Sequence, residues 1–249
     1  MWEPVGRGVA DGSALPSATR LQTGYHIERD DHHLLVDCGS GVTHRLAQAE
    51  VSHHEIDTVL LTHHHLDHVA DLPTLAKARC LDGHPSLRVL GPPGTRAVCN
   101  HLFAVDDLDD RVSLDIEELP MDTATLDLGP HHITTARMAH SKPGFAYRFD
   151  DALTISGDTA PAPGVAELAD GTAVLVHECA YPDGVETDGH TTPTALGEQI
   201  ADIDLDRLYL THLFPDTEAH ADELAATVSE HTDATVTVAT DLDEIAIDT

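Results

Sequence analysis

The chain has 249 residues, of which 41% are hydrophobic and only 4% aromatic, so a core built mainly from Ala, Val, Leu and Ile is expected. No apolar run approaches the roughly 18 residues that a membrane span needs. Residues 1–13 contain no apolar stretch of signal-peptide type. These features predict one domain over residues 1–249, located in the cytoplasm and without a membrane partner.

The formal net charge is −31, from 44 acidic and 13 basic residues, and only Lys77 and Lys142 are lysines. An acidic surface keeps a protein soluble, and it is also typical of adaptation to a high-salt cytoplasm, as in haloarchaea. We favour the second interpretation, a halophilic protein. The charge then says little about the substrate, because concentrated salt screens the field that would otherwise repel nucleic acid. The four cysteines form no CxxC pair and do not fit a disulfide scaffold.

In the first half of the chain, apolar runs of strand type alternate with stretches of helical spacing. Residues 24–39 hold two apolar stretches joined by a turn at Asp30-Asp31. Strands are further expected at 56–62 and 87–90, and helices at 43–50, 71–81 and 95–103. The GPPG sequence at 91–94 opens a helix whose amides could receive an anion, or it is merely a tight turn. An acidic linker follows at 106–110.

The second half begins with a run of strands and ends with strands and helices in alternation. Strands are expected at 114–116, 124–128, 132–139, 144–149, 152–156, 172–177, 207–211 and 235–239, and helices at 193–201 and 221–231. Residues 241–248 alternate between polar and apolar. This order fits an α/β fold in which two sheets pack face to face with helices outside.

The sequence THHHLDH directly follows a buried strand of the first half. His63 and His65 are two positions apart and therefore project to one side of an extended segment, whereas His64 points the other way and is expected to be structural. Asp67 and His68 follow where the chain turns toward a helix. Three imidazoles and one carboxylate thus converge at a strand end, and this donor set suits Zn²⁺. The spacing disfavours the alternative of a loop that is merely rich in histidine.

This pattern resembles the HxHxDH motif of the metallo-β-lactamase superfamily, which implies an αββα sandwich of two mixed sheets. Later elements of the superfamily match His140, Asp158 and His212, each near the end of an expected strand. The resemblance implies two divalent metal ions, with zinc expected and manganese or iron as alternatives. It implies that one ion is held by His63, His65 and His140 and the other by Asp67, His68 and His212, with Asp158 shared between them.

Further segments resemble the RNase Z-like group of that superfamily, including its HEA and HST elements. They are VHECAY at 176–181, GHTT at 189–192, Gly24, DCG at 37–39 and GPPG at 91–94. The resemblance implies that His190 lies beside the metals and assists the reaction, and that Glu178 orients His190. The alternative for Glu178 is an ordinary paired carboxylate at a strand end.

The chain departs from that group in two places. Members of the group open with an apolar strand, and residues 1–13 show none, so that strand is degenerate or the true start differs. The tRNA-processing members insert a long arm between the third histidine and the bridging aspartate. Here His140 and Asp158 are 18 positions apart, which leaves room for little beyond a hairpin. The resemblance is therefore to RNase Z-like hydrolases without the tRNA-binding arm.

The expected function is that of a phosphodiesterase acting on a small phosphodiester. Two metals roughly 3.5–4 Å apart would lower the pKa of a bridging water, and the resulting hydroxide would attack phosphorus. Asp67 can both bind a metal and accept a proton, while His190 is placed to protonate the leaving oxygen. His190, Asp67 and Glu178 are accordingly the candidate catalytic residues.

Three other functions stay open. A tRNA 3′-processing endonuclease would need a grip on RNA, and the sequence has no basic patch with interleaved aromatics. A carboxylic ester, thioester or lactone hydrolase would use the same metals without needing His190. The presence of every ligand type together with His190 argues against a non-catalytic metal-binding module. Related folds often dimerise, which favours a homodimer.

Overall fold

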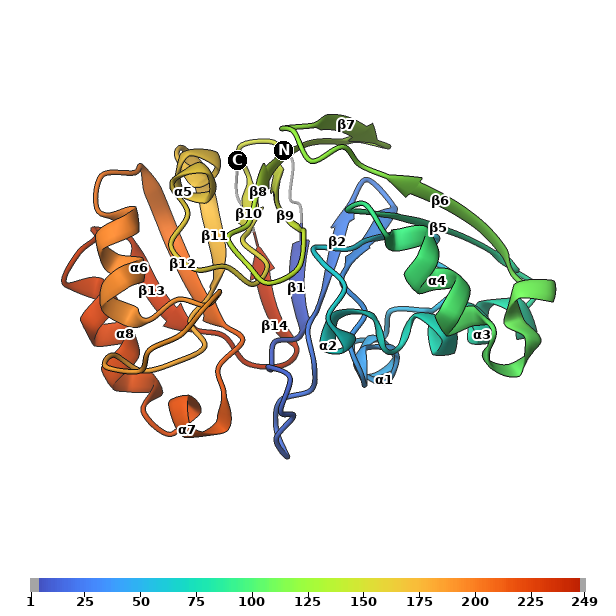
Figure 1. The fold of residues 1–249 in the computed structure, drawn as a ribbon, viewed down its shortest axis with the longest axis horizontal. Helices are drawn as coiled ribbons and strands as arrows, with labels where there is room; N and C mark the ends of the chain where they lie inside the picture. Colours follow the sequence, from blue (N-terminus) through green and yellow to red (C-terminus); the bar gives the residue numbers. More distant parts are fainter. Residues whose placement is uncertain (1–4, 247–249) are drawn as a thin grey trace.

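Two mixed sheets of seven strands each pack face to face, with helices on their outer sides (Figure 1). This computed structural model describes residues 5–246 of the chain. The first sheet has the order β14-β1-β2-β3-β4-β5-β6 and the second has the order β13-β12-β11-β10-β9-β8-β7. The predicted arrangement of two sheets between helices is therefore confirmed.

The strands of the first sheet are β1 (Val5–Ala10), β2 (Gly24–Arg29), β3 (His32–Val36), β4 (Thr58–Leu60), β5 (Ser86–Gly91), β6 (Ser113–Glu118) and β14 (Asp243–Ala246). Those of the second are β7 (Thr125–Leu128), β8 (His131–Arg137), β9 (Phe145–Phe149), β10 (Leu153–Ile155), β11 (Thr172–Glu178), β12 (Leu205–Thr211) and β13 (Thr235–Val238). The helices are α1 (Val42–Gln48), α2 (Leu66–Val69), α3 (Leu72–Leu81), α4 (Thr95–Phe103), the 3₁₀ helix η1 (Val105–Asp110), α5 (Pro163–Ala169), α6 (Pro193–Ile200), α7 (Pro215–Glu218) and α8 (Ala221–Ser229). None of the helices within residues 5–246 is long and apolar enough to cross a membrane.

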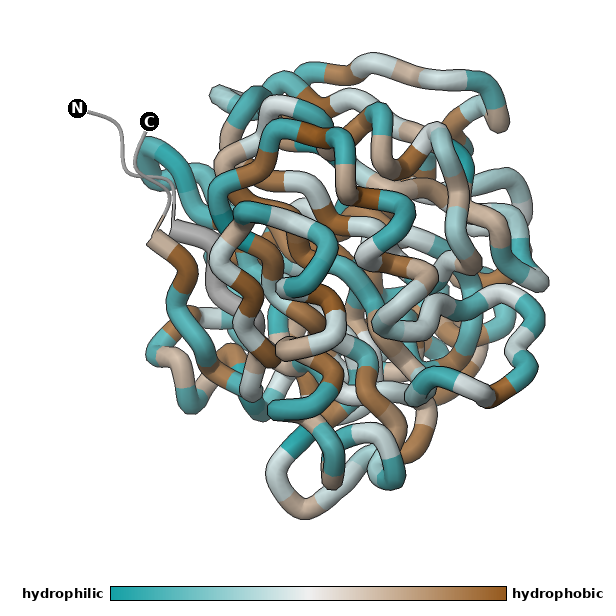
Figure 2. Tube along the Cα trace, turned by 90° about the vertical axis from the view of Figure 1, so that its left-hand side faces the viewer, coloured by the Kyte–Doolittle hydropathy of each residue, from teal (hydrophilic) through white to brown (hydrophobic). Residues whose placement is uncertain are grey.

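The layers follow from the alternation of side chains along the strands. In β3, Leu34 and Val36 face the other sheet and join a buried cluster that includes Phe145 of β9. Leu35 points to the opposite face, where it packs in a second cluster with Leu46 of α1. Burying a side chain of this size contributes about 1.5–3 kcal/mol. The hydropathy of the chain shows the same division, with apolar segments inside and polar loops around them (Figure 2).

The first strand decides between two alternatives that the sequence left open, a degenerate first strand or a different start. Val5–Ala10 forms β1, which pairs antiparallel with both β2 and β14, so the first strand is present in a degenerate form. Glycines at positions 6 and 8 remove the apolar alternation by which a strand is recognised, and backbone pairing on both sides holds the strand in place. Residues 1–4 lie outside the described part of the chain.

Several short elements were not predicted. The helices α2, α5 and α7 have only 4, 7 and 4 residues, which is too short for a helical period to show in the sequence. The stretch expected as an acidic linker is the 3₁₀ helix η1. Asp243–Ala246, within the stretch of polar-apolar alternation, forms β14, which pairs with β1.

The parallel strands bring the chemically relevant loops to one edge. In the second sheet, β10, β11 and β12 run parallel, so Asp158, Glu178 and His212 lie near the carboxyl ends of neighbouring strands. In the first sheet, β3 and β4 also run parallel, and Asp37 and His63 follow these two strands. The candidate site is built where these edges of the two sheets meet.

Candidate metal centre

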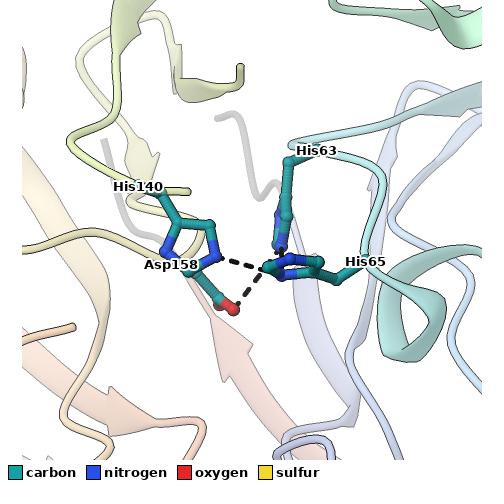
Figure 3. A group of neighbouring side chains, drawn as sticks. All are labelled: His63, His65, His140 and Asp158. Carbon is teal, nitrogen blue, oxygen red and sulfur yellow. Dashed lines mark hydrogen bonds and ion pairs between the residues drawn. The ribbon is translucent and has the colours of Figure 1, made fainter. Parts of the chain in front are cut away.

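Four side chains from three loops form a first group of metal-ligand type (Figure 3). His63 and His65 follow β4, His140 follows β8 and Asp158 follows β10. The Nδ1 atom of His65 lies 3.0 Å from Nε2 of His63 and 3.0 Å from Nε2 of His140. The Nε2 atom of His63 lies 3.6 Å from Oδ2 of Asp158. The three rings stand nearly perpendicular to one another, at interplanar angles of 82°, 77° and 81°, so their nitrogens converge.

A second group shares Asp158 with the first. Its other members are Asp67 and His68, which belong to α2, and His212, which follows β12. The Oδ2 atom of Asp158 lies 3.4 Å from Nε2 of His68 and 3.3 Å from Nε2 of His212. The Oδ2 atom of Asp67 lies 3.6 Å and 3.9 Å from the same two nitrogens. The seven predicted ligands thus lie in two groups that have one carboxylate in common.

Both groups fit divalent metal ions. Within each group one ligand atom per residue lies within 4.8 Å of the others, and the close pairs approach the roughly 3.3 Å edge of a tetrahedral zinc site. Burial lowers the pKa of His63, of His65 and of His140, which keeps these rings neutral and their lone pairs available. The Nε2 atom of His68 is buried and makes no hydrogen bond within residues 5–246, as an atom reserved for a metal would.

Asp37 belongs to this centre, although it was not predicted as a site residue. Its Oδ2 atom accepts a hydrogen bond from Nδ1 of His68 at 2.7 Å. The amide and the hydroxyl of Thr62 donate to the same carboxylate at 2.8 Å and 2.7 Å. The carboxylate therefore fixes the proton of His68 on Nδ1 and turns Nε2 toward Asp158. The available signal was an aspartate that directly follows the buried strand β3 and precedes a Cys-Gly pair.

Two other proposed ligands are also oriented through their Nδ1 atoms, which face away from the centre. Nδ1 of His140 donates to the carbonyl oxygen of Gly189 at 2.6 Å, which leaves Nε2 free. Nδ1 of His212 lies 3.2 Å from the hydroxyl of Thr23. Neither partner could be inferred from a motif, because one is a backbone carbonyl and the other lies 189 positions away in the sequence.

His190 lies beside the two groups without belonging to either. Its ring is within 14° of parallel to that of His212 at a centroid distance of 5.7 Å, and it lies 5.0 Å from the ring of His140. Its Nδ1 atom lies 3.1 Å from Oε1 of Glu178. Burial would lower the pKa of His190, but the hydrogen bond to Glu178 raises it above its ordinary value. Burial raises the pKa of Glu178 to about 7, while the hydrogen bond to His190 acts against that rise.

The turn at 91–94 does not offer free amides. The Oε1 atom of Glu118 accepts hydrogen bonds from the amides of Gly94 and Arg96 at 3.1 Å and 3.0 Å, so it occupies the N-terminus of α4. Of the two readings of this turn, the structural one holds. His64 faces the same turn, with Nε2 at 2.8 Å from the hydroxyl of Thr95, and belongs to neither ligand group.

A third His/Glu group lies away from the centre, on the hairpin of β2 and β3. It consists of His26, Glu28 and His33. The rings of His26 and His33 are within 10° of parallel, and Nε2 of the first lies 2.9 Å from Nδ1 of the second. That geometry suits one imidazole donating a hydrogen bond to its neighbour, whereas the rings of the first group converge at steep angles. We therefore assign no metal to this hairpin.

The fold and the centre together define a class of protein. The family profile described as a beta-lactamase superfamily domain matches residues 32–213. The chain belongs to the metallo-β-lactamase superfamily, and the predicted αββα sandwich is confirmed. Members of this family and the relatives below are metal-dependent hydrolases, so the predicted enzyme class is also confirmed, and the fold implies divalent metal ions.

More particularly, the relatives include ribonucleases Z. That of Mycolicibacterium gilvum (strain PYR-GCK) is 27% identical, over 95% of this chain and 93% of the relative. That of Mycobacterium sp. (strain KMS) is 32% identical, over 70% of this chain and 68% of the relative. The resemblance to the RNase Z-like group is therefore confirmed.

Two solved structures extend this likeness to the whole fold. The metallo-beta-lactamase fold protein YhfI from Bacillus subtilis superimposes with a TM-score of 0.87 at 23% identity, over 99% of this chain and all (100%) of that one. The short form of human tRNase Z superimposes with a TM-score of 0.80 at 22% identity, over 98% of this chain and 100% of that one. At these identities the likeness concerns the fold alone.

Proposed function

We propose that the chain is a phosphodiesterase with two metal ions, held by His63, His65, His140 and Asp158 and by Asp67, His68, Asp158 and His212. The observation that carries this proposal is the position of His190, which is held by the buried carboxylate of Glu178 next to ligands of both groups. A hydrolase for activated carboxylic esters needs no such proton donor. A phosphodiester with a poor leaving group does, because an alkoxide must be protonated as it departs.

Each residue has a distinct role in this proposal. The bound metals, with zinc expected and manganese or iron as alternatives, supply Lewis acidity and activate water at neutral pH. Asp67 holds one metal and can accept the proton that the nucleophile loses. His190 donates a proton to the leaving oxygen, and Glu178 holds the ring in place and raises the pKa of His190. Glu178 is thus a positioning residue.

A small substrate is favoured by the segment between His140 and Asp158. This segment contains only β9 and β10, which pair antiparallel as a hairpin. No helical arm projects from it within the described part of the chain, so a large ligand would have no gripping element there.

The second candidate is 3′ processing of tRNA. It is favoured by the relatives named ribonuclease Z, which align with most of this chain. The same residues would perform it, since the bond that is broken is also a phosphodiester. The two candidates differ only in what binds outside the metal centre.

The test compares substrates with and without a chelator. Bis-p-nitrophenyl phosphate, p-nitrophenyl acetate and a precursor tRNA with a 3′ trailer are offered to the metal-loaded protein, and metal content is measured on the same samples. We expect chelator-sensitive hydrolysis of the phosphodiester well above that of the acetate. Hydrolysis of the acetate alone would contradict the proposal. Efficient cleavage of the precursor tRNA at its trailer would favour the second candidate.

A further inference from the structure

Lysine is almost absent from this chain, and its two lysines differ in their surroundings. Lys77 of α3 forms an ion pair with Asp106, with Nζ at 2.6 Å from Oδ2. Lys142 is exposed, and no carboxylate of residues 5–246 lies within 4.0 Å of its ammonium group. In a protein with 44 acidic residues, an ammonium group without such a partner is available for an anion from outside.

Lys142 also lies in a segment with an unusual composition. Residues 128–149 contain no Asp or Glu, although acids make up 44 of the 249 residues of the chain. The same segment carries Arg137, Lys142 and Arg148, and the guanidinium of Arg148 is paired with the carboxylate of Asp151 at 2.7 Å. Arg137 at the end of β8 and Lys142 in the loop that follows therefore make this end of the hairpin cationic on an otherwise acidic protein.

The position of Lys142 is next to the metal centre. It lies two residues after His140, in the loop between β8 and β9. The hydroxyl of its neighbour Ser141 lies 3.3 Å from Nε2 of His65. Lys142 therefore stands on the rim of the centre, beside the loop that carries the first ligands.

We propose that Lys142 binds a second anionic group of the substrate, a phosphate other than the one that is hydrolysed. This inference rests on the proposed phosphodiesterase function and narrows its substrate class to phosphodiesters that carry a further phosphate. A lysine suits this role, because its ammonium is a compact charge on a flexible stem that can reach phosphates at different distances. The second phosphate belongs either to a small phosphorylated diester or to the next link of a nucleotide strand.

Two substrates with the same reporter group isolate this contact. Thymidine 5′-(p-nitrophenyl phosphate) and its 3′-phosphorylated form both release p-nitrophenolate, and they differ only in the extra phosphate. For each enzyme form, the measured quantity is the ratio of kcat/KM between the two substrates at one fixed salt concentration. We expect the native protein to prefer the 3′-phosphorylated substrate. Lys142→Gln should reduce that preference about tenfold through KM, the scale of one charge-assisted contact, and Lys142→Arg should keep most of it.

Lys77→Gln is the matched control, because it removes the only other lysine and is expected to leave the preference unchanged. A binding measurement makes the test independent of turnover. The affinities of the metal-loaded protein for thymidine 3′,5′-bisphosphate and for thymidine 5′-phosphate are compared by calorimetry, with metal content measured in every variant. If neither diester is hydrolysed, the phosphodiesterase proposal fails, and the binding ratio still decides the role of Lys142.

Binding of a short oligonucleotide, measured as a third ligand, distinguishes the two possible sources of the second phosphate. A loss of affinity on Lys142→Gln for the bisphosphate supports the small-substrate source. A loss for the oligonucleotide alone supports the strand. Unchanged ratios for all ligands, with the metal content intact, would overturn the inference and leave Lys142 as a solvated surface residue.

Discussion

The Nδ1 atom of His190 lies 3.1 Å from the Oε1 atom of Glu178, a carboxylate that is only 2% exposed. The backbone amides of Thr159, Ala180 and Thr191 donate to the same carboxylate. Glu178 is therefore rigidly held, and its hydrogen bond to Nδ1 fixes the orientation of the His190 ring. Because Nδ1 is engaged by Glu178, the opposite nitrogen of His190 is the one that can act on a substrate.

Replacing His190 with alanine should separate catalysis from metal binding. His190→Ala should retain the metals and lower turnover of a phosphodiester with an alkoxide leaving group by roughly 10²–10⁴-fold, the usual scale for a general acid. Asp67→Ala should differ in kind, since metal occupancy and rate should fall together. The measurement is steady-state kinetics with metal content for both variants, and His44→Ala, an exposed histidine of α1, serves as the control. Full phosphodiesterase activity in His190→Ala would refute the assigned role.

The pH dependence should reveal whether Glu178 acts through His190. The acid form of His190 is the active one, and its pKa is raised by Glu178, so activity should fall as the pH rises through that raised pKa. Glu178→Gln removes the negative charge, lowers the pKa of His190 and should move the alkaline fall of the rate to lower pH. A diester with an alkoxide leaving group is required, because p-nitrophenolate leaves without a proton. If the fall of the rate occurs at the same pH in Glu178→Gln as in the native protein, Glu178 has a purely structural role.

Asp37 is expected to control metal affinity through its hydrogen bond to Nδ1 of His68. Asp37→Asn keeps the shape of the side chain but removes the charge that fixes the Nδ1 proton of His68. Metal affinity should fall by about 10–100-fold, the usual effect of losing such a partner. Titration with a competing chelator measures it, and activity should return at excess metal. Asp109→Asn, at an exposed position of η1, is the control. An unchanged affinity would show that Thr62 and packing alone orient His68.

Much of this centre could be predicted from the sequence, because His63 to His68 are contiguous and directly follow a buried strand. His140, Asp158 and His212 could be placed only by their order along the chain, since each is an unremarkable residue by itself. Asp37 was recognisable only as an aspartate that follows a buried strand. Its role, like that of the Gly189 carbonyl, depends on how β3 and the loop before α6 approach the centre in space. The strand β1 could be stated only as one of two alternatives, because glycines interrupt its apolar pattern.

The high negative charge leads to a prediction about salt. Forty-four acids against 13 basic residues repel one another, and the screening length grows from about 3 Å at 1 M salt to about 10 Å at 0.1 M. The melting temperature and the activity should therefore fall as salt is diluted below the molar range. Thermal melts across a sodium chloride series measure this. A melting temperature that is constant or rises on dilution would rule out the halophilic interpretation.

The most direct test of the account is the metal content of the protein. Seven residues in two groups that share Asp158 are proposed to hold two ions, so elemental analysis of protein purified without chelator should find about two divalent metals per chain. Replacing His63 or His212 with alanine should lower that number, because each belongs to only one group. Protein that contains no transition metal, and that gains no activity when zinc, manganese or iron is added, would contradict the account.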